Sequence, residues 1–205
     1  QIGNFGRSGA TLLRKGSSPY WKQDVYAQSL EFLPQVVLIN LGTNDAVNRN
    51  WLEHGEEFEK DYRDLIEVYR QLESKPKILL SNLTPMYAAH PRTQECIPHR
   101  LIIEKTIEAL AAEYGLSVID FKTPISDQAK LFPDGLHPNT LGNELMAMAA
   151  FEAIAGQTAP KDPSIRPIPV EGDTQALIKE GKAVNFTLGS WKHRKDWVEG
   201  AGAGK

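Results

Sequence analysis

Short apolar runs alternate along the chain with longer stretches in which apolar and polar residues recur at helical spacing. The apolar runs are rich in β-branched residues, which is typical of strands buried on both faces of a parallel sheet; they span residues 36–41, 77–81 and 116–120. The longer stretches predict helices over residues 20–32, 58–72, 101–111 and 143–154. Gly115 is placed to end the third helix, and Asn139 or Thr140 is placed to cap the fourth.

This order of elements predicts an α/β fold with a doubly wound parallel sheet. In such sheets, ligands bind beyond the carboxyl ends of the strands. Residues 42–45 leave the first predicted strand, residues 82–85 leave the second, and residues 134–137 precede the last helix. We therefore expect these three loops to meet at one rim of the sheet, and catalytic side chains to lie there.

Composition narrows the class of protein. The 205 residues are 41% hydrophobic, which is enough to bury the core of one α/β domain with a tail. The net charge of −3 is mixed in sign and argues against a nucleic-acid partner, and no apolar run approaches the roughly 18 residues that span a membrane. The single cysteine, Cys96, excludes an internal disulfide and is interpreted as an idle thiol. His54, His90 and His99 lack the spacing of metal ligands, so no metal site is expected.

The character of the sequence changes near Ala159. Prolines recur from there to residue 169, which excludes a helix, and residues 182–188 form another apolar run. We expect a main domain over residues 1–157 and a linker or surface strap over residues 158–181. Residues 182–205 then form either the start of a β-rich module or an arm packed on the main domain. Both ends of the chain are interpreted as truncation points, and the sequence itself does not indicate a cellular compartment.

An acid and an imidazole lie three residues apart in a turn-forming string between two prolines. His137 is suited to act as general base and then general acid near neutral pH, and Asp134 is placed to accept a hydrogen bond from its second ring nitrogen. The alternative is a surface Asp-Gly turn with an incidental histidine. Two further residues suit the stabilisation of an oxyanion: Asn44 through its amide, and Gly9 through a backbone N–H open to close approach. Taken singly, each of these two is better explained by an ordinary turn.

In this combination and order, the residues resemble the blocks of the SGNH hydrolases, also called the GDSL esterase family. Gly9 matches the oxyanion glycine of the second block, Asn44 the oxyanion asparagine of the third, and Asp134 and His137 the acid and base of the last. The resemblance covers roughly residues 1–155. It implies a flavodoxin-like, three-layer α/β/α fold, a serine nucleophile, no cofactor, and a small-molecule or glycan acyl ester as substrate.

One block of the family is absent from the chain. The Gly-Asp-Ser block carries the nucleophile at the end of the first, central strand, and it would fall before Gln1. We therefore expect a domain without that strand, in which a strand near residues 2–5 and the strand at 36–41 lose their shared partner. Such a chain is expected to be inactive, and unstable or oligomeric. Ser8 lies in a near match to a Gly-x-Ser-x-Gly elbow, interrupted at Ala10, and is the alternative nucleophile.

Three short strings, at residues 9–13, 19–21 and 50–51, are closest to bacterial carbohydrate esterases, including sialate O-acetylesterase-like proteins. The resemblance thus implies a carboxylic-ester hydrolase that removes acetyl groups from a carbohydrate, and it alone suggests a secreted or periplasmic protein. The alternatives are a lipid esterase or thioesterase of the same fold and a non-catalytic carbohydrate-binding or scaffold protein. Tyr87 is a candidate for the substrate cleft, with a surface position as the alternative. Asp45 is expected to hold its loop, and Trp21 and Trp51 are expected at the edge of the core rather than on sugar rings.

Overall fold

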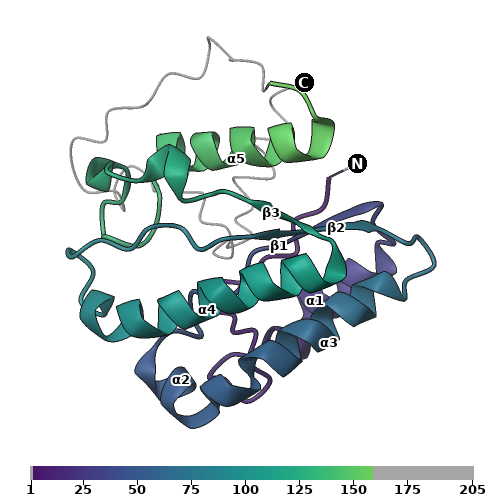
Figure 1. Ribbon diagram of the computed structural model, residues 1–205, viewed down its shortest axis with the longest axis horizontal. Coiled ribbons are helices and arrows are strands. Elements are labelled where there is room, and N and C mark those ends of the chain that lie inside the picture. Colours follow the sequence, from purple (N-terminus) through teal and green to yellow (C-terminus); the bar gives the residue numbers. More distant parts are fainter. Residues whose placement is uncertain (1, 159–205) are drawn as a thin grey trace.

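The structure is a computed structural model that describes residues 2–158 (Figure 1). The expected linker and C-terminal module, from residue 159 onward, lie outside these residues. Three parallel strands form one sheet in the order β1 (Val36–Ile39), β2 (Lys77–Ser81) and β3 (Ser117–Ile119). The predicted α/β fold with a parallel sheet is confirmed.

Helices cover both faces of this sheet. The α-helices of the described residues are α1 (Asp24–Glu31), α2 (Asn48–His54), α3 (Phe58–Arg70), α4 (Thr93–Tyr114) and α5 (Thr140–Ala155). The short 3₁₀ segments are η1 (Tyr20–Lys22), η2 (Gly55–Glu57), η3 (Thr123–Ile125) and η4 (Ala129–Leu131). Helix α5 lies on one face of the sheet, and α1, α3 and α4 lie on the other, which gives the expected α/β/α layers (Figure 1).

Successive residues of each strand contribute to different halves of the core. Ile78 and Leu80 of β2 belong to the cluster that contains the buried residues of α3 and α4. Leu79, between them, packs with Ile119 of β3 and Met146 of α5 in a second cluster. Because both faces of the sheet are covered, the strands read as continuous apolar runs rather than as an alternation of apolar and polar residues.

Two predicted helices differ from the observed ones. The helix expected over residues 20–32 is divided into η1 and α1, with Gln23 in an extended conformation between them. Helix α4 begins at Thr93, two turns before the expected residue 101, and contains Pro98. The buried face of this extra segment is formed by Thr93, Cys96, His99 and Arg100. Three of these four residues are polar, so the helical periodicity is not visible as a pattern of apolar residues.

The strand expected near residues 2–5 is absent, and that prediction was wrong. Residues 2–4 are exposed, and the N–H of Gly6 binds the side chain of Asn4 in a local turn. A strand exists only through ladder bonds to a neighbour, and no other described strand reaches this segment. Within residues 2–158, β1 pairs only with β2 and is therefore an edge strand. Its first residue, Val36, is 38% exposed.

The predicted ends of two helices are confirmed. Gly115 ends α4 in the left-handed conformation, with φ 65°. The side chain of Asn139 accepts a hydrogen bond from the N–H of Gly142 and so caps α5. This cap fixes where α5 starts and therefore where the preceding Asp134–His137 turn emerges. No helix within the described residues is long and apolar enough to cross a membrane.

Candidate active site

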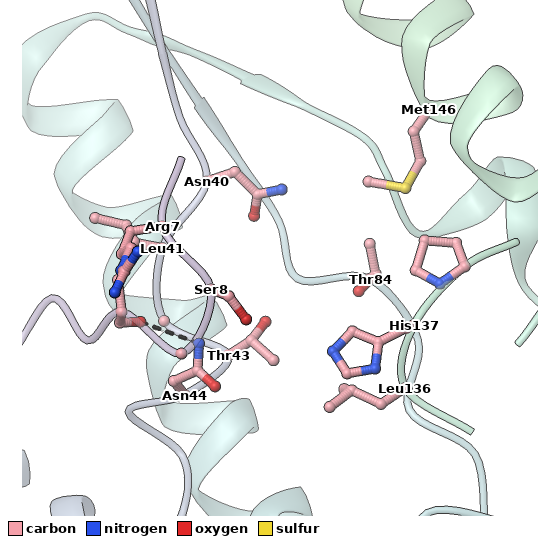
Figure 2. A pocket seen from close by; sticks show the side chains of 14 residues that line it. Arg7, Ser8, Asn40, Leu41, Thr43, Asn44, Thr84, Leu136, His137 and Met146 are labelled. Carbon is pink, nitrogen blue, oxygen red and sulfur yellow. Dashed lines mark hydrogen bonds between the residues drawn. The ribbon is translucent and has the colours of Figure 1, made fainter. Parts of the chain in front are cut away.

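A pocket lies beyond the carboxyl end of β1 and brings together residues from distant parts of the chain (Figure 2). One side, here called the loop wall, consists of residues 7–10 and 40–44. The opposite side, the histidine wall, consists of Thr84, residues 136–138 and Met146. The expected meeting of the three loops at one rim is observed, and a fourth segment, residues 7–10, joins them.

His137 and Asp134 form a pair on the histidine wall. The Nδ1 atom of His137 lies 2.5 Å from Oδ2 of Asp134. The other carboxylate oxygen, Oδ1, accepts the backbone N–H groups of Leu136 at 3.0 Å and of His137 at 2.7 Å. Partial burial opposes ionisation of Asp134, but these hydrogen bonds from the backbone and ring of His137 outweigh it and lower the pKa of the carboxyl group. An ionised carboxylate only accepts, so the proton of a neutral ring lies on Nδ1, and Nε2 has the free lone pair of a base.

Asn44 and Gly9 lie together on the loop wall. The Asn44 side-chain amide donates to the carbonyl oxygen of Ala10 at 3.0 Å, a contact drawn in Figure 2. This contact uses one of the two N–H groups of the amide. Gly9 has φ +75° in a turn closed by a hydrogen bond from Ala10 N–H to the carbonyl of Arg7, at 3.1 Å. Because L-residues rarely adopt this φ, the turn requires glycine on conformational grounds.

Asp45 holds the segment that follows Gly9. Its fully buried carboxylate accepts the backbone N–H groups of Leu12 at 3.0 Å and of Leu13 at 2.8 Å. Burial raises the pKa of Asp45 to about 6, even though the two backbone hydrogen bonds favour the charged form. The expected role of Asp45 as a loop-holding acceptor agrees with these contacts.

Two other candidate residues take different positions. Ser8 lines the pocket and its side chain is labelled beside Thr43 and Asn44 on the loop wall (Figure 2). Tyr87 is not among the residues that line this pocket. Its hydroxyl donates to the carbonyl of Ile125 at 2.8 Å, and its ring packs on Phe132. The hydroxyl and ring of Tyr87 thus contact Ile125 and Phe132, and a substrate-binding role for this residue stays a prediction.

The two tryptophans lie at the edge of the core, as expected. Trp21 donates from Nε1 to the carbonyl of Leu12 and lies under the guanidinium of Arg14. Trp51 stacks on the ring of His99, whose Nδ1 lies 2.8 Å from the carbonyl oxygen of Ala46. Within residues 2–158, no group of three or more His, Cys, Asp and Glu side chains is arranged to hold a metal ion.

Sequence reasoning did not identify several residues that line the pocket. Asn40 directly follows β1, and Thr84 lies in the loop that leaves β2. Both positions are at carboxyl ends of strands, which was an available signal, but neither residue belongs to a recognised motif. Met146 was missed for a different reason, since it reads as a core residue of α5 and is 2% exposed.

The sequence profile of the GDSL-like lipase/acylhydrolase family matches residues 1–145. The chain belongs to this family. Gly9, Asn44, Asp134 and His137 all lie within the matched segment, and the structure places these four residues on or beside the two walls of one pocket.

Relatives of this GDSL-like family member agree with the assignment. An acetylxylan esterase from Xylanibacter ruminicola is 34% identical over an alignment that covers 75% of this chain. The chain spans 35% of the length of that relative. A protein described as a GDSL-like lipase from Parabacteroides merdae is 27% identical, with a TM-score of 0.52 over 62% of this chain and 63% of that one. A protein described as an arylesterase from Agrobacterium tumefaciens shares the fold, with 21% identity and a TM-score of 0.54 over 74% of this chain and 76% of that one.

Proposed function

We propose that the protein is a carboxylic-ester hydrolase that removes acetyl groups from a carbohydrate. The observation that carries this proposal is the meeting, across one pocket, of the His137–Asp134 pair and the Asn44–Gly9 wall. A base held by a carboxylate faces amide donors suited to an oxyanion, which is the arrangement that acyl transfer requires.

In the proposed reaction, Nε2 of His137 accepts the proton of a serine hydroxyl as that oxygen attacks the ester carbonyl. Asp134 holds the ring through Nδ1 and stabilises the imidazolium that forms. The negative charge that develops on the carbonyl oxygen is stabilised by the second N–H of Asn44 and the backbone N–H of Gly9. His137 then returns the proton to the leaving sugar oxygen, and the acyl-enzyme is hydrolysed by the same sequence of steps with water.

We place the nucleophile beside Asn40, at the carboxyl end of a further strand that pairs with the open edge of β1. The support is that β1 has no neighbour on this side within the described residues, and that a parallel strand there would end at the pocket. Ser8 remains the alternative within the chain, because it lines the same pocket.

The 34% identity to an acetylxylan esterase supports an acetylated glycan as the substrate. The pocket itself is consistent with this class. Asn40, Thr43 and Thr84 present amide and hydroxyl groups that suit sugar hydroxyls, and no carboxylate lines the pocket within the described residues.

Hydrolysis of 4-nitrophenyl acetate tests the proposal in the 205-residue chain and in the longest natural form that contains it. In whichever form is active, His137→Ala is expected to lower kcat by about 10³-fold or more, because the general base is removed. His54→Ala is the matched control, since His54 lies on α2 and is not part of the pocket. Retained activity in a folded His137→Ala protein would refute the assignment.

A second comparison separates the candidates for the nucleophile. If Ser8→Ala abolishes the activity of the 205-residue chain, the nucleophile is Ser8. Activity in the longer form alone places the nucleophile outside the chain. If both forms bind acetylated xylo-oligosaccharides and neither hydrolyses them, the protein is the carbohydrate-binding alternative.

A further inference from the structure

The Asp134–His137 turn needs support from outside itself. The side chains of His137 and Asp134 are 45% and 52% exposed, and among the described residues the hydrogen bonds of the carboxylate stay within the turn. These bonds fix the ring relative to Asp134 but not relative to Asn44 on the opposite wall. The position of the pair across the pocket must therefore be set by contacts between the turn and other segments.

One such contact comes from the loop between β2 and α4. The backbone N–H of Tyr87 donates to the carbonyl oxygen of Gly135, in the middle of the turn, at 2.7 Å. Gly135 has φ +80°, and a Cβ atom at this position would lie 2.4 Å from the backbone nitrogen of His90. The loop therefore packs directly against the backbone of the turn, and no side chain separates the two.

Thr93 holds this loop in place. Its side chain lies at the start of α4, where the residue is 4% exposed. The hydroxyl is 2.6 Å from the carbonyl oxygen of Tyr87 and 2.8 Å from that of His90, so its single proton is shared between the two acceptors. The loop is also attached to η3, because the hydroxyl of Tyr87 donates to the carbonyl of Ile125.

We propose that Thr93 is a positioning residue for the His137–Asp134 pair and acts through the backbone of Tyr87. This inference rests on the proposed function, because it assumes that the pair carries out the proton transfers. The hydroxyl of Thr93 fixes the peptide groups around Tyr87, the Tyr87 N–H fixes Gly135, and Gly135 fixes the turn that carries the imidazole. Tyr87 thereby belongs to the support of the base rather than to the substrate contact.

Thr93→Val and Thr93→Ser test this inference in the 205-residue chain. Valine keeps the shape of the side chain and removes the hydroxyl, whereas serine keeps the hydroxyl. In Thr93→Val, we expect hydrogen exchange at the amides of Tyr87, Leu136 and His137 to rise about tenfold, the factor that follows from loss of one hydrogen bond of typical strength. Exchange at Leu79 and Leu80 of β2 should not change. In Thr93→Ser, the amides of Tyr87, Leu136 and His137 should keep the protection that they have in wild type.

Thr106→Val is the matched control. Thr106 lies on the exposed side of the same helix, and its hydroxyl also donates to a backbone carbonyl, that of Ile102 at 3.0 Å. This variant should leave exchange in the Asp134–His137 turn unchanged. Equal acceleration in β2 and in the turn of Thr93→Val, or no acceleration in the turn, would overturn the proposal. If Thr93→Val does not fold, Tyr87→Phe removes the contact with Ile125 and must show the same selective effect.

Kinetics provide the functional readout in the form of the protein that hydrolyses 4-nitrophenyl acetate. Thr93→Val should lower kcat by about 10- to 100-fold with little change in KM, because a displaced base affects proton transfer more than binding. Selective loss of exchange protection with unchanged kcat would overturn the positioning role. The exchange measurement does not depend on activity, so failure of the proposed function, read from His137→Ala, is distinguishable from failure of this inference.

Discussion

The buried carboxylate of Asp45 allows a sharp test of the loop wall. Asp45 is fully buried, accepts two backbone N–H groups and lies near the second buried carboxylate, Asp61. Replacing it with asparagine preserves its shape and one oxygen acceptor but removes the titrating group. The variant therefore separates two effects, which are the loss of one acceptor and the loss of a proton-dependent contribution to stability.

The size of the proton-dependent contribution follows from the pKa. Burial raises the pKa of Asp45 from its ordinary value of 3.8 to about 6, and each pKa unit corresponds to about 1.4 kcal/mol. Since the pKa is higher in the folded than in the unfolded protein, the contribution to stability is fully present below about pH 4. It is lost as the pH rises through about 6, by about 3 kcal/mol in total. The lost acceptor adds a constant cost of about 1–3 kcal/mol to the asparagine variant at every pH.

Urea unfolding of wild type and Asp45→Asn between about pH 4 and pH 7 measures this contribution. The free energy of unfolding of wild type relative to the variant should fall by about 2–3 kcal/mol across this range. Asp127→Asn is the control, because Asp127 is exposed and its left-handed φ of 59° suits asparagine equally well. If the difference between wild type and Asp45→Asn is constant with pH, the account of Asp45 as a buried carboxylate that takes up a proton is wrong.

Three further predictions concern separate parts of the molecule. In the active form of the protein, Asn44→Ala should lower kcat by about 10²-fold or more in the 4-nitrophenyl acetate assay; an unchanged kcat would remove Asn44 from the oxyanion site. Asn139→Ala should lower the free energy of unfolding by about 1 kcal/mol, measured by urea titration, because α5 loses its cap. A loss no larger than that of an exposed control such as Gln157→Ala would contradict this. The open edge of β1 should make the 205-residue chain associate with rising concentration in sedimentation velocity, and Val36→Lys should reduce this association. A wild-type chain that is monomeric at all concentrations would disprove the role of this edge.

The sequence predicted the three strands of the sheet more accurately than the start of α4. The strands are buried on both faces, so a continuous apolar run marks each of them without knowledge of the rest of the fold. The start of α4 was not predicted, because its buried face carries the polar residues Thr93, His99 and Arg100 beside Cys96. One guanidinium nitrogen of Arg100 donates to the carbonyl of Thr84, a contact made by the tertiary structure, while Nη1 is buried without a hydrogen-bond partner among the described residues.

In the candidate site, too, some residues could be predicted from the sequence and others could not. The pairing of Asp134 with His137 is local, three residues apart in one turn, and the sequence contained it. Gly9 and Asn44 could be named from their order in a family pattern. Asn40 and Thr84 follow strands but belong to no motif, so their positions alone did not single them out. The contribution of Thr93 could not be predicted, because it depends on which loops the fold brings together. The contacts that position a site are long-range in sequence, and only the folded chain reveals them.

The hydrogen bond from Asn44 to Ala10 has a consequence for how mutational data on the loop wall are interpreted. The amide that is proposed to stabilise the oxyanion also ties the strand-end loop to the turn that carries Gly9. Its removal therefore disturbs two donors with one substitution. The energetic effects of changes at Asn44 and at Gly9 should not add, and the double variant should lose less than the two single variants combined. If the proposed function holds, Asn44 and Gly9 therefore act as one cooperative unit in the stabilisation of the oxyanion.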